Sequence, residues 1–249
     1  MAYLQAFDKR DPPLTDKCIV LDLDHTLLNT FEQPEIRSDL EIDLDPKHLE
    51  IKRRLYHFNL IDVFTKCGEG HKIETFGIRR PHLEEFLDFC FRYFRIVAVW
   101  SAGKHKYVNR ICLDIFQDFQ DPHCIFTCIH CKDDTPVLEK PLARMIEKMP
   151  GMSLANTFAI DDNLSTFAKV NPENGVLIPP YKPKATIDGL NADDRCLLQL
   201  KEWLLRPEVM SAPDVRELDK SSIFSSTAFD VVPDEDEDSF DEELFEDVD

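Results

Sequence analysis

No stretch of the sequence approaches the roughly 20 consecutive apolar residues that a helix needs to cross a bilayer. The strongest apolar run, from Ile96 to Trp100, is five residues long. The N-terminal residues also lack the basic-then-apolar pattern of a secretory signal and the Arg-rich amphipathic pattern of an organellar address. We therefore expect an intracellular protein, in the nucleus or the cytoplasm, that does not contact membranes.

The sequence lacks both the cysteine density of a disulfide scaffold and an excess of basic residues. Eight cysteines in 249 residues are too few for a disulfide-stabilised scaffold, and without an export signal we expect them to remain thiols. Lys and Arg number 29 against 48 Asp and Glu, which gives a net charge of -19. Strong nonspecific binding to nucleic acid needs a cationic surface that neutralises phosphates. Direct nucleic-acid binding is therefore not expected.

The negative charge is concentrated near the C-terminal end. Twelve Asp and Glu residues and no Lys or Arg lie between residues 230 and 249. Hydrophobic periodicity is lost earlier, so residues 207–249 are predicted to form a disordered acidic tail. Phe240, Leu244 and Phe245 are interleaved with carboxylates there. This composition fits either docking onto a basic protein partner or a solubilising role.

Short apolar runs alternate with amphipathic segments in the rest of the chain. Continuous apolar runs are typical of strands buried on both faces of a parallel sheet, and apolar residues at helical spacing indicate helices packed on that sheet. The predicted strands are Cys18–Leu21, Ile96–Trp100, Ile125–Ile129, Thr157–Ile160 and Gly175–Ile178, and helices are predicted from Pro81, after Gly103, from Pro141 and after Asp193 or Asp194. The pattern predicts an α/β domain over residues 17–206, after a short polar lead at residues 1–16, with helices on both faces of a parallel sheet.

A segment from about residue 30 to 78 interrupts this alternation. It contains hairpin-like runs, Leu55 to Phe64 and Ile73 to Ile78, on either side of the turn-rich Gly68-Glu69-Gly70. We expect a β-rich insert after the first strand. Its aromatic side chains either line a groove for an extended peptide or form a small satellite core; they are Phe31, Tyr56, Phe58, Phe64 and Phe76.

Acidic side chains directly follow two of the predicted strands. Asp22 and Asp24 come after the first strand, and Asp161 and Asp162 come after the fourth. The carboxyl ends of parallel strands meet at one edge of the sheet, where open α/β sheets bind ligands. Four carboxylates in one place would repel one another unless a cation were present. Oxygen ligands without His or Cys favour Mg²⁺, which also binds phosphate oxygens, so the sequence predicts a Mg²⁺ cofactor and a phosphate substrate.

Two more polar residues belong to the same predicted edge. Ser101 follows the strand Ile96–Trp100, and Lys140 precedes the helix from Pro141. Each has a simpler interpretation. Ser101 lies in Ser101-Ala102-Gly103, which is suitable for a turn, and Lys140 could be an ordinary surface lysine near a helix start.

In chain order, these residues resemble the four motifs of the haloacid dehalogenase (HAD) superfamily. Asp22-Leu23-Asp24-His25-Thr26 corresponds to the first motif, and Ser101, Lys140 and Asp161-Asp162 correspond to the other three. The resemblance implies a HAD-like Rossmannoid fold. It covers about residues 17–205.

Within that superfamily, three short segments resemble those of one particular family. The Arg80-Pro81-His82 helix start, the Trp100-Ser101-Ala102 turn and the paired acids at 161–162 are similar to those of the FCP/SCP, or NLI-interacting-factor-like, protein phosphatases. Two positions depart from the usual pattern. Ser101 stands where Thr is more common, and Asp162 stands where small SCP-like members often have Asn. Ser keeps the hydroxyl, and Asp adds charge at the metal.

The resemblance implies a two-step phosphoryl transfer. Asp22 would attack phosphorus and form an aspartyl phosphate, and Asp24 would act first as general acid and then as general base. Ser101 and Lys140 would orient the phosphoryl oxygens and balance their charge.

The same resemblance implies a set of metal ligands. Mg²⁺ would be held by Asp22, Asp162 and the backbone carbonyl of Asp24. Asp161 would either ligate the metal or fix Lys140.

These features together predict a monomeric, Mg²⁺-dependent protein serine/threonine phosphatase. Its substrate would be a phosphoprotein or phosphopeptide, with the carboxy-terminal repeats of RNA polymerase II as the substrate class that the resemblance suggests. Two alternatives remain open at this point. The chain could hydrolyse a small phosphate or a nucleic-acid end, or it could be a catalytically silent module that binds partners through its acidic tail.

Several His and Cys residues are not assigned to the site. His25 is interpreted as a packing or hydrogen-bonding residue that points away from the catalytic carboxylates. A second group lacks the spacing of a zinc site and is interpreted as packing residues and reduced thiols; it comprises His123, Cys124, Cys128, His130 and Cys131.

Overall fold

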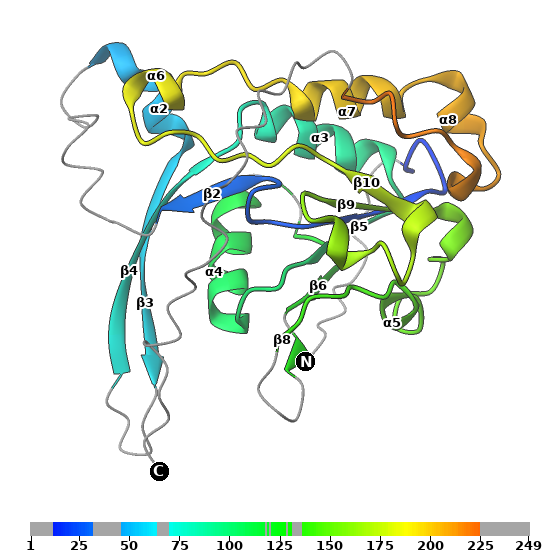
Figure 1. Ribbon diagram of the computed structural model, residues 1–249, viewed down its shortest axis with the longest axis horizontal. Coiled ribbons are helices and arrows are strands. Elements are labelled where there is room, and N and C mark those ends of the chain that lie inside the picture. The colour runs from blue at the N-terminus through cyan, green and yellow to red at the C-terminus, as the bar shows by residue number, and fades with distance from the viewer. Residues whose placement is uncertain are drawn as a thin grey trace.

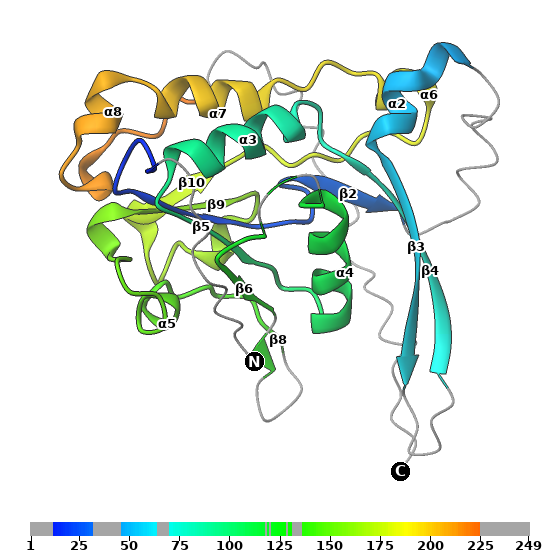
Figure 2. The same ribbon diagram turned by 180° about the vertical axis from the view of Figure 1, so that it is seen from behind.

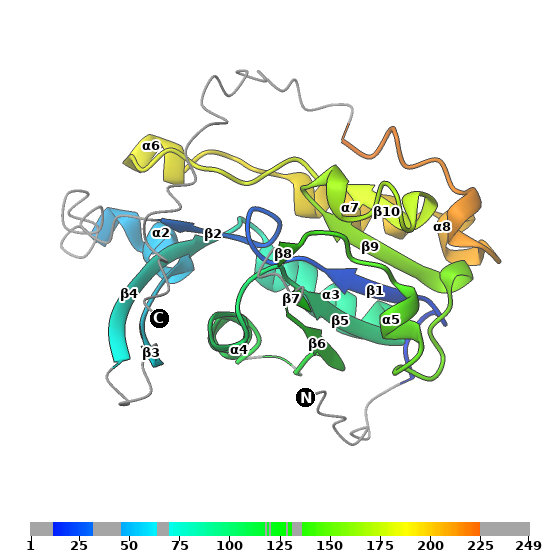
Figure 3. The same cartoon turned by 60° about the horizontal axis from the view of Figure 1, so that its bottom comes forward.

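The computed structural model describes residues 12–31, 46–63, 70–117, 119, 121–127, 129–130 and 136–224. Its centre is a five-stranded parallel sheet with strand order β10-β9-β1-β5-β6 (Figures 1 and 3). The strands are β1 (Cys18–Leu21), β5 (Ile96–Trp100), β6 (Cys124–Phe126), β9 (Thr157–Asp161) and β10 (Gly175–Leu177). The predicted parallel sheet is thus confirmed. Its middle strand is β1, which places the residues that follow Leu21 at the centre of one sheet edge.

Helices cover both faces of this sheet, as predicted. Alternate side chains of β1 define the two faces, because Ile19 and Leu21 belong to one buried cluster and Cys18 and Val20 to another. The first cluster includes residues of α3, α4 and α7, and the second includes residues of α5. These helices are α3 (Leu83–Tyr93), α4 (His105–Ile115), α5 (Ala143–Ile146) and α7 (Cys196–Leu204).

The residues between β1 and α3 form the expected β-rich insert. It contains a three-stranded antiparallel sheet with order β2-β4-β3, whose strands β3 and β4 extend away from the central sheet (Figures 1 and 2). Its elements are β2 (Leu28–Phe31), the short helices η1 (Pro46–His48) and α2 (Leu49–Arg54), β3 (Leu55–Val63) and β4 (Gly70–Arg79).

The aromatic side chains of the insert pack rather than line a groove. Tyr56, Phe58 and Phe76 are all less than 5% exposed. Tyr56 stacks on Phe58 with ring centroids 5.9 Å apart, and Phe31 stacks on Phe76 at 5.7 Å. The structure therefore favours packing over a groove, but Tyr56 and Phe58 belong to the main cluster that contains β1 and not to a separate satellite core. Phe64 lies outside the described residues.

The remaining short elements connect these layers. They are β7 (Ile129–His130), β8 (Pro136–Val137), η2 (Leu154–Asn156), η3 (Leu164–Thr166), η4 (Pro172–Asn174) and α6 (Ile187–Leu190). Leu190 of α6 and Tyr181 are buried together with Ile51 of α2, so the chain after β10 returns to cover the insert. None of the helices in the described part of the chain is long and apolar enough to span a membrane.

The predicted boundary at residue 206 is wrong, because the chain stays folded to residue 224. Residues after 206 form α8 (Pro207–Ser211) and η5 (Val215–Glu217). Val209, Val215 and Ile223 are buried in the same cluster as β1. Their irregular spacing produces no helical period, which is why the sequence pattern missed them. Residues 225–249, which include the acidic segment, lie outside the described part.

Candidate active site

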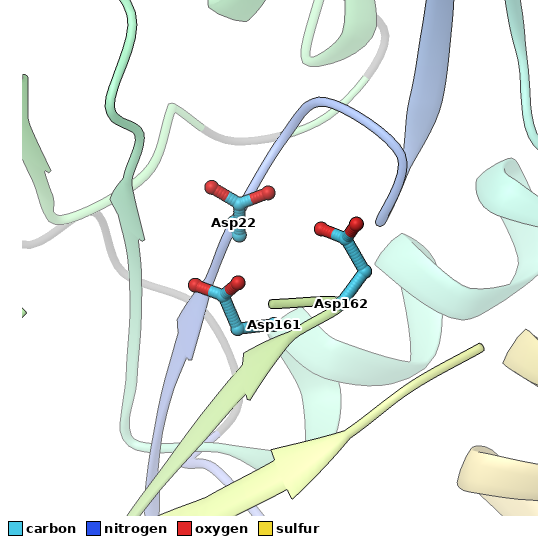
Figure 4. Close-up of side chains that lie close together, drawn as sticks. All are labelled: Asp22, Asp161 and Asp162. Carbon is cyan, nitrogen blue, oxygen red and sulfur yellow. The ribbon is translucent and has the colours of Figure 1, made fainter. Parts of the chain in front are cut away.

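Three carboxylates meet at the carboxyl edge of the central sheet. Asp22 follows β1, Asp161 ends the neighbouring strand β9, and Asp162 comes next (Figure 4). One oxygen from each carboxylate lies within 4.8 Å of the others. Within the described ranges, this is the one group of His, Cys, Asp and Glu side chains close enough to hold a metal ion. The register of β1 and β9 thus brings together Asp22 and Asp161, which are 161 − 22 = 139 positions apart in the chain.

Lys140 is buried against two of these carboxylates. Its Nζ donates to Oδ1 of Asp22 at 2.6 Å and to Oδ2 of Asp161 at 2.7 Å. Its backbone N–H donates to the carbonyl oxygen of Thr166 at 2.7 Å, which fixes the start of its side chain. Burial disfavours the ammonium, but the two carboxylates outweigh burial and raise the pKa of Lys140. Lys140 is therefore not an ordinary surface lysine.

The structure favours one of the two roles left open for Asp161. Its Oδ2 accepts from Lys140, and its Oδ1 accepts from the backbone N–H of Asn163 at 2.9 Å. Both oxygens are thus engaged by protein donors. Asp161 is therefore placed to hold Lys140.

The carboxylates carry more negative charge than Lys140 can balance. Burial raises the pKa of Asp22, and Asp161 and Asp24 add to this effect while Lys140 opposes it. Burial, followed by the charge of Asp161, raises the pKa of Asp162 to about 6. Three carboxylates and one ammonium leave two uncompensated charges in a poorly solvated place. A hard divalent cation with oxygen ligands fits this donor set, and Mg²⁺ is such a cation.

This charge imbalance predicts a distinct pH dependence of the metal-free protein. The folded state binds a proton at Asp162 with a pKa of about 6, whereas an unfolded Asp titrates near 3.9. Ionised Asp162 therefore lowers the free energy of unfolding. This destabilisation is complete above pH 6 and disappears as pH falls toward about 4. In chelator, we expect the melting temperature of the wild type to rise relative to that of Asp162→Asn over this range. A difference that does not change with pH would show that the pKa of Asp162 is not raised.

Asp24 lies apart from the three clustered carboxylates. Its Oδ1 accepts a short hydrogen bond from the hydroxyl of Tyr107 on α4 and lies 3.4 Å from Oγ1 of Thr30 on β2. Burial raises the pKa of Asp24, and the hydrogen bonds from Tyr107 and Thr30 oppose this effect. An aspartic acid whose pKa lies above its ordinary value is suited to giving up and taking back a proton.

Ser101 lies at the expected edge of the sheet. Its side chain also forms a hydrogen bond within the Ser101-Ala102-Gly103 turn. It follows β5, which pairs with β1, and it is 1% exposed. Its backbone N–H donates to the carbonyl oxygen of Phe126 at 3.0 Å. Its Oγ accepts from the backbone N–H of Gly103 at 3.0 Å, which leaves the hydroxyl proton for donation.

The structure also locates the His and Cys residues that were set aside. The side chain of His25 does not point away from the cluster, since its Nδ1 lies 3.8 Å from Oδ2 of Asp162. His25 has a left-handed backbone, with a φ of 61°, so the alternation of side chains along an extended strand does not apply to it. His123 Nδ1 accepts from the backbone N–H of Val97 at 3.1 Å, and Cys124 is a buried free thiol. Cys128 and Cys131 and the side chain of His130 lie outside the described part.

Four residues that support the site were not identified from the sequence. Thr26 donates to Oδ1 of Asp162 at 3.3 Å, and Tyr107 and Thr30 contact Asp24. Arg80 is fully buried, and it donates to the carbonyl oxygen of Thr26 at 3.0 Å and to both carboxylate oxygens of Asp194 at 3.0 and 2.8 Å. The helix start at Arg80 was a signal for this position, but the sequence does not show what the side chain reaches.

The fold and the site together define a class of protein. A parallel sheet whose middle strand leads into Asp22 and Asp24, with Lys140 and the paired acids at the same edge, is the arrangement expected of a HAD-like phosphatase. Residues 17–216 match the family model described as NLI interacting factor-like phosphatase. The chain belongs to this family, which places it among the phosphoric monoester hydrolases.

Individual proteins show the same relationship. The chain is similar to the CTD phosphatase-like proteins 355R of invertebrate iridescent viruses 3 and 6, with 27% identity over 175 residues and 28% over 204. These matches cover 66% and 76% of this chain and 84% and 98% of the viral proteins. The solved structure of Fcp1, an essential RNA polymerase II CTD phosphatase, shares the fold with a TM-score of 0.52 at 19% identity. That match covers 76% of this chain and 46% of the solved one, so the chain spans less than half of it.

Proposed function

We propose that the protein is a Mg²⁺-dependent serine/threonine phosphatase that works through an aspartyl-phosphate intermediate. The observation that carries this proposal is the position of the Lys140 ammonium, 2.6 Å from Asp22 and 2.7 Å from Asp161, with Asp162 beside them. A cation next to a buried carboxylate can balance the charge of an incoming phosphoryl group. Asp24 is held by hydrogen bonds from Tyr107 and Thr30, and it is available for proton transfer.

The first step breaks the ester bond of the substrate. The carboxylate of Asp22 attacks phosphorus through one of its oxygens and forms an acyl phosphate. The bond between phosphorus and the serine oxygen breaks with its electron pair on oxygen, and Asp24 gives that oxygen its proton. Lys140 stays beside the new acyl phosphate, and the Ser101 hydroxyl donates to a phosphoryl oxygen.

The second step releases phosphate. Asp24, now ionised, takes a proton from a water molecule, and the water oxygen attacks phosphorus. The bond between phosphorus and Asp22 breaks, which restores the carboxylate and frees inorganic phosphate. Asp24 ends the cycle protonated, as it began.

Asp22, Asp162 and the backbone carbonyl of Asp24 would hold Mg²⁺. When bound, Mg²⁺ would neutralise charge on the phosphoryl oxygens and on the carboxylates. The two uncompensated negative charges of the cluster support this assignment. The raised pKa of Asp162 also supports this metal assignment. A carboxylate whose ionised form is destabilised by burial is stabilised strongly by a nearby cation.

We further propose phosphoserine or phosphothreonine in CTD-like peptides as the substrate, in the nucleus or the cytoplasm. The names of the viral relatives and of Fcp1 refer to CTD phosphatases, and this supports a protein substrate.

A substrate panel tests this proposal. With Mg²⁺, we expect phosphoserine peptides to be hydrolysed with a kcat/KM at least about tenfold above that for nucleotides and sugar phosphates, because a peptide makes additional contacts. Chelation should remove activity, and added Mg²⁺ should restore it. Phosphate release from each substrate is the measurement. Preference for small phosphates would reject the peptide substrate, and no release from any ester would reject the phosphatase mechanism.

A further inference from the structure

We propose that Tyr107, Thr30 and Tyr56 form a chain of hydroxyl groups that positions Asp24, so that Oδ2 of Asp24 always carries the transferred proton. Tyr107 is the positioning residue in direct contact, and the other two orient it. The inference rests on the proposed function, in which Asp24 is the general acid and base. It concerns residues that neither the sequence motifs nor the metal ligands include.

The distances define the order of this hydroxyl chain. The hydroxyl of Tyr56 lies 2.7 Å from Oγ1 of Thr30, and Oγ1 of Thr30 lies 2.6 Å from the hydroxyl of Tyr107. The hydroxyl of Tyr107 in turn donates to Oδ1 of Asp24. The other contacts of these groups are longer, at 3.4 Å from Thr30 to Asp24 and from Tyr56 to the carbonyl oxygen of Asn29.

Counting protons gives the chain one direction. An ionised Asp24 can only accept, so Tyr107 uses its single proton on Oδ1. Tyr107 must then accept from Thr30, and Thr30 must accept from Tyr56. All three protons point toward Asp24, and hydrogen bonds aligned in this way strengthen one another.

This direction suits both states of the proposed reaction. When Asp24 is ionised, Oδ1 accepts from Tyr107. When Asp24 is protonated on Oδ2, Oδ1 is the carbonyl-like oxygen and still accepts from Tyr107. No hydroxyl has to reorient as the proton leaves and returns. The hydroxyl chain therefore determines which oxygen of Asp24 exchanges the proton. The hydroxyl groups themselves do not exchange it.

Gly77 on β4 makes room for this arrangement. It is the cross-strand partner of Thr30 on β2 and also of Tyr56 on β3, so the three residues form one row across the insert sheet. A Cβ atom at Gly77 would overlap the ring and hydroxyl of Tyr56. The missing side chain is what allows Tyr56 to cross β4 and reach Thr30. Tyr56 is 3% exposed, so its hydroxyl needs this partner.

Two substrates with different leaving groups can show whether a variant impairs the general acid or impairs the enzyme in some other way. A serine alkoxide needs a proton to leave, whereas p-nitrophenolate leaves readily without one. In the presence of Mg²⁺, we expect Tyr107→Phe to lower kcat/KM for a phosphoserine peptide about 30-fold, which is part of the ~10²–10⁴-fold effect of a general acid. For p-nitrophenyl phosphate, the expected decrease is less than about threefold.

Additional variants test the chain itself. Thr30→Val should show the same selective loss at about tenfold, and Tyr56→Phe and Gly77→Ala a smaller one, because they act farther from Asp24. Tyr93→Phe is the matched control, since the buried hydroxyl of Tyr93 donates at 2.7 Å to the carbonyl oxygen of Leu204, away from the site. It should leave the ratio of the two kcat/KM values unchanged.

The outcomes distinguish this inference from the proposed function. Equal losses on both substrates in Tyr107→Phe and Thr30→Val, or no loss on either, would overturn the positioning role. Selective loss in Tyr93→Phe would overturn it as well. A wild-type protein that hydrolyses neither substrate with Mg²⁺ would instead reject the proposed function, and the inference with it.

Discussion

Asp22→Asn is expected to lower phosphatase activity by at least about 10⁴-fold, because it removes the nucleophile of a covalent mechanism. The amide keeps the shape of the side chain, and its oxygen can still accept from Lys140, so the fold should persist. An amide oxygen attacks phosphorus poorly and carries no charge for a metal. The loss should therefore appear in kcat with every substrate, whatever the leaving group.

Phosphoenzyme trapping provides the more direct measurement. Wild-type protein quenched in acid after brief exposure to a labelled ester should carry label, and Asp22→Asn should carry none. Asp88→Asn makes the same chemical change on the half-exposed surface of α3, where Asp88 pairs with Arg92 at 2.9 Å. This control should keep full activity. Turnover or labelling retained in Asp22→Asn would exclude Asp22 as the nucleophile.

Lys140→Met should cause the second-largest loss, about 10³-fold in activity together with lower stability. Methionine fills the volume but leaves Asp22 and Asp161 facing each other without a cation. Removing one member of a buried charge pair typically costs about 3–5 kcal/mol of unfolding free energy near neutral pH. The loss should shrink as pH falls, because either carboxylate can then take up a proton.

Denaturant unfolding at several pH values tests the stability part of this prediction, and phosphate release tests the activity part. Lys169→Met is a matched control, because Lys169 is 84% exposed and lies 3.8 Å from its partner Glu139. An exposed pair of this kind contributes little to stability. If Lys140→Met and Lys169→Met had the same stability and activity, the buried cation would have neither proposed role.

The sequence was sufficient to predict the layers of the fold, because local patterns determine them. The continuous apolar run Cys18–Leu21 and the helical period from Leu83 onward each reflect burial of neighbouring residues. The segment from 207 to 224 was misjudged because Val209, Val215 and Ile223 are buried at irregular intervals. Their burial depends on which surface the chain meets after α7, and no short-range period encodes that.

The same distinction applies to the site. Asp22, Asp161 and Asp162 were predictable because strand ends in a parallel sheet meet at one edge. Tyr107 and Thr30 were not, since their contact with Asp24 depends on how the insert sheet and α4 are placed against β1. The row of Thr30, Gly77 and Tyr56 requires strand register, which the sequence does not state.

The folded end of the chain also bears on the strand that leads to the nucleophile. Lys17, just before β1, is 3% exposed, and its Nζ donates at 2.9 Å to the carbonyl oxygen of Ala212. Residues after α7 thus form a hydrogen bond with the residue that precedes β1. We expect a protein shortened at residue 206 to lose this hydrogen bond and to expose apolar side chains of the core, and so to unfold more easily than one that keeps residues 207–224.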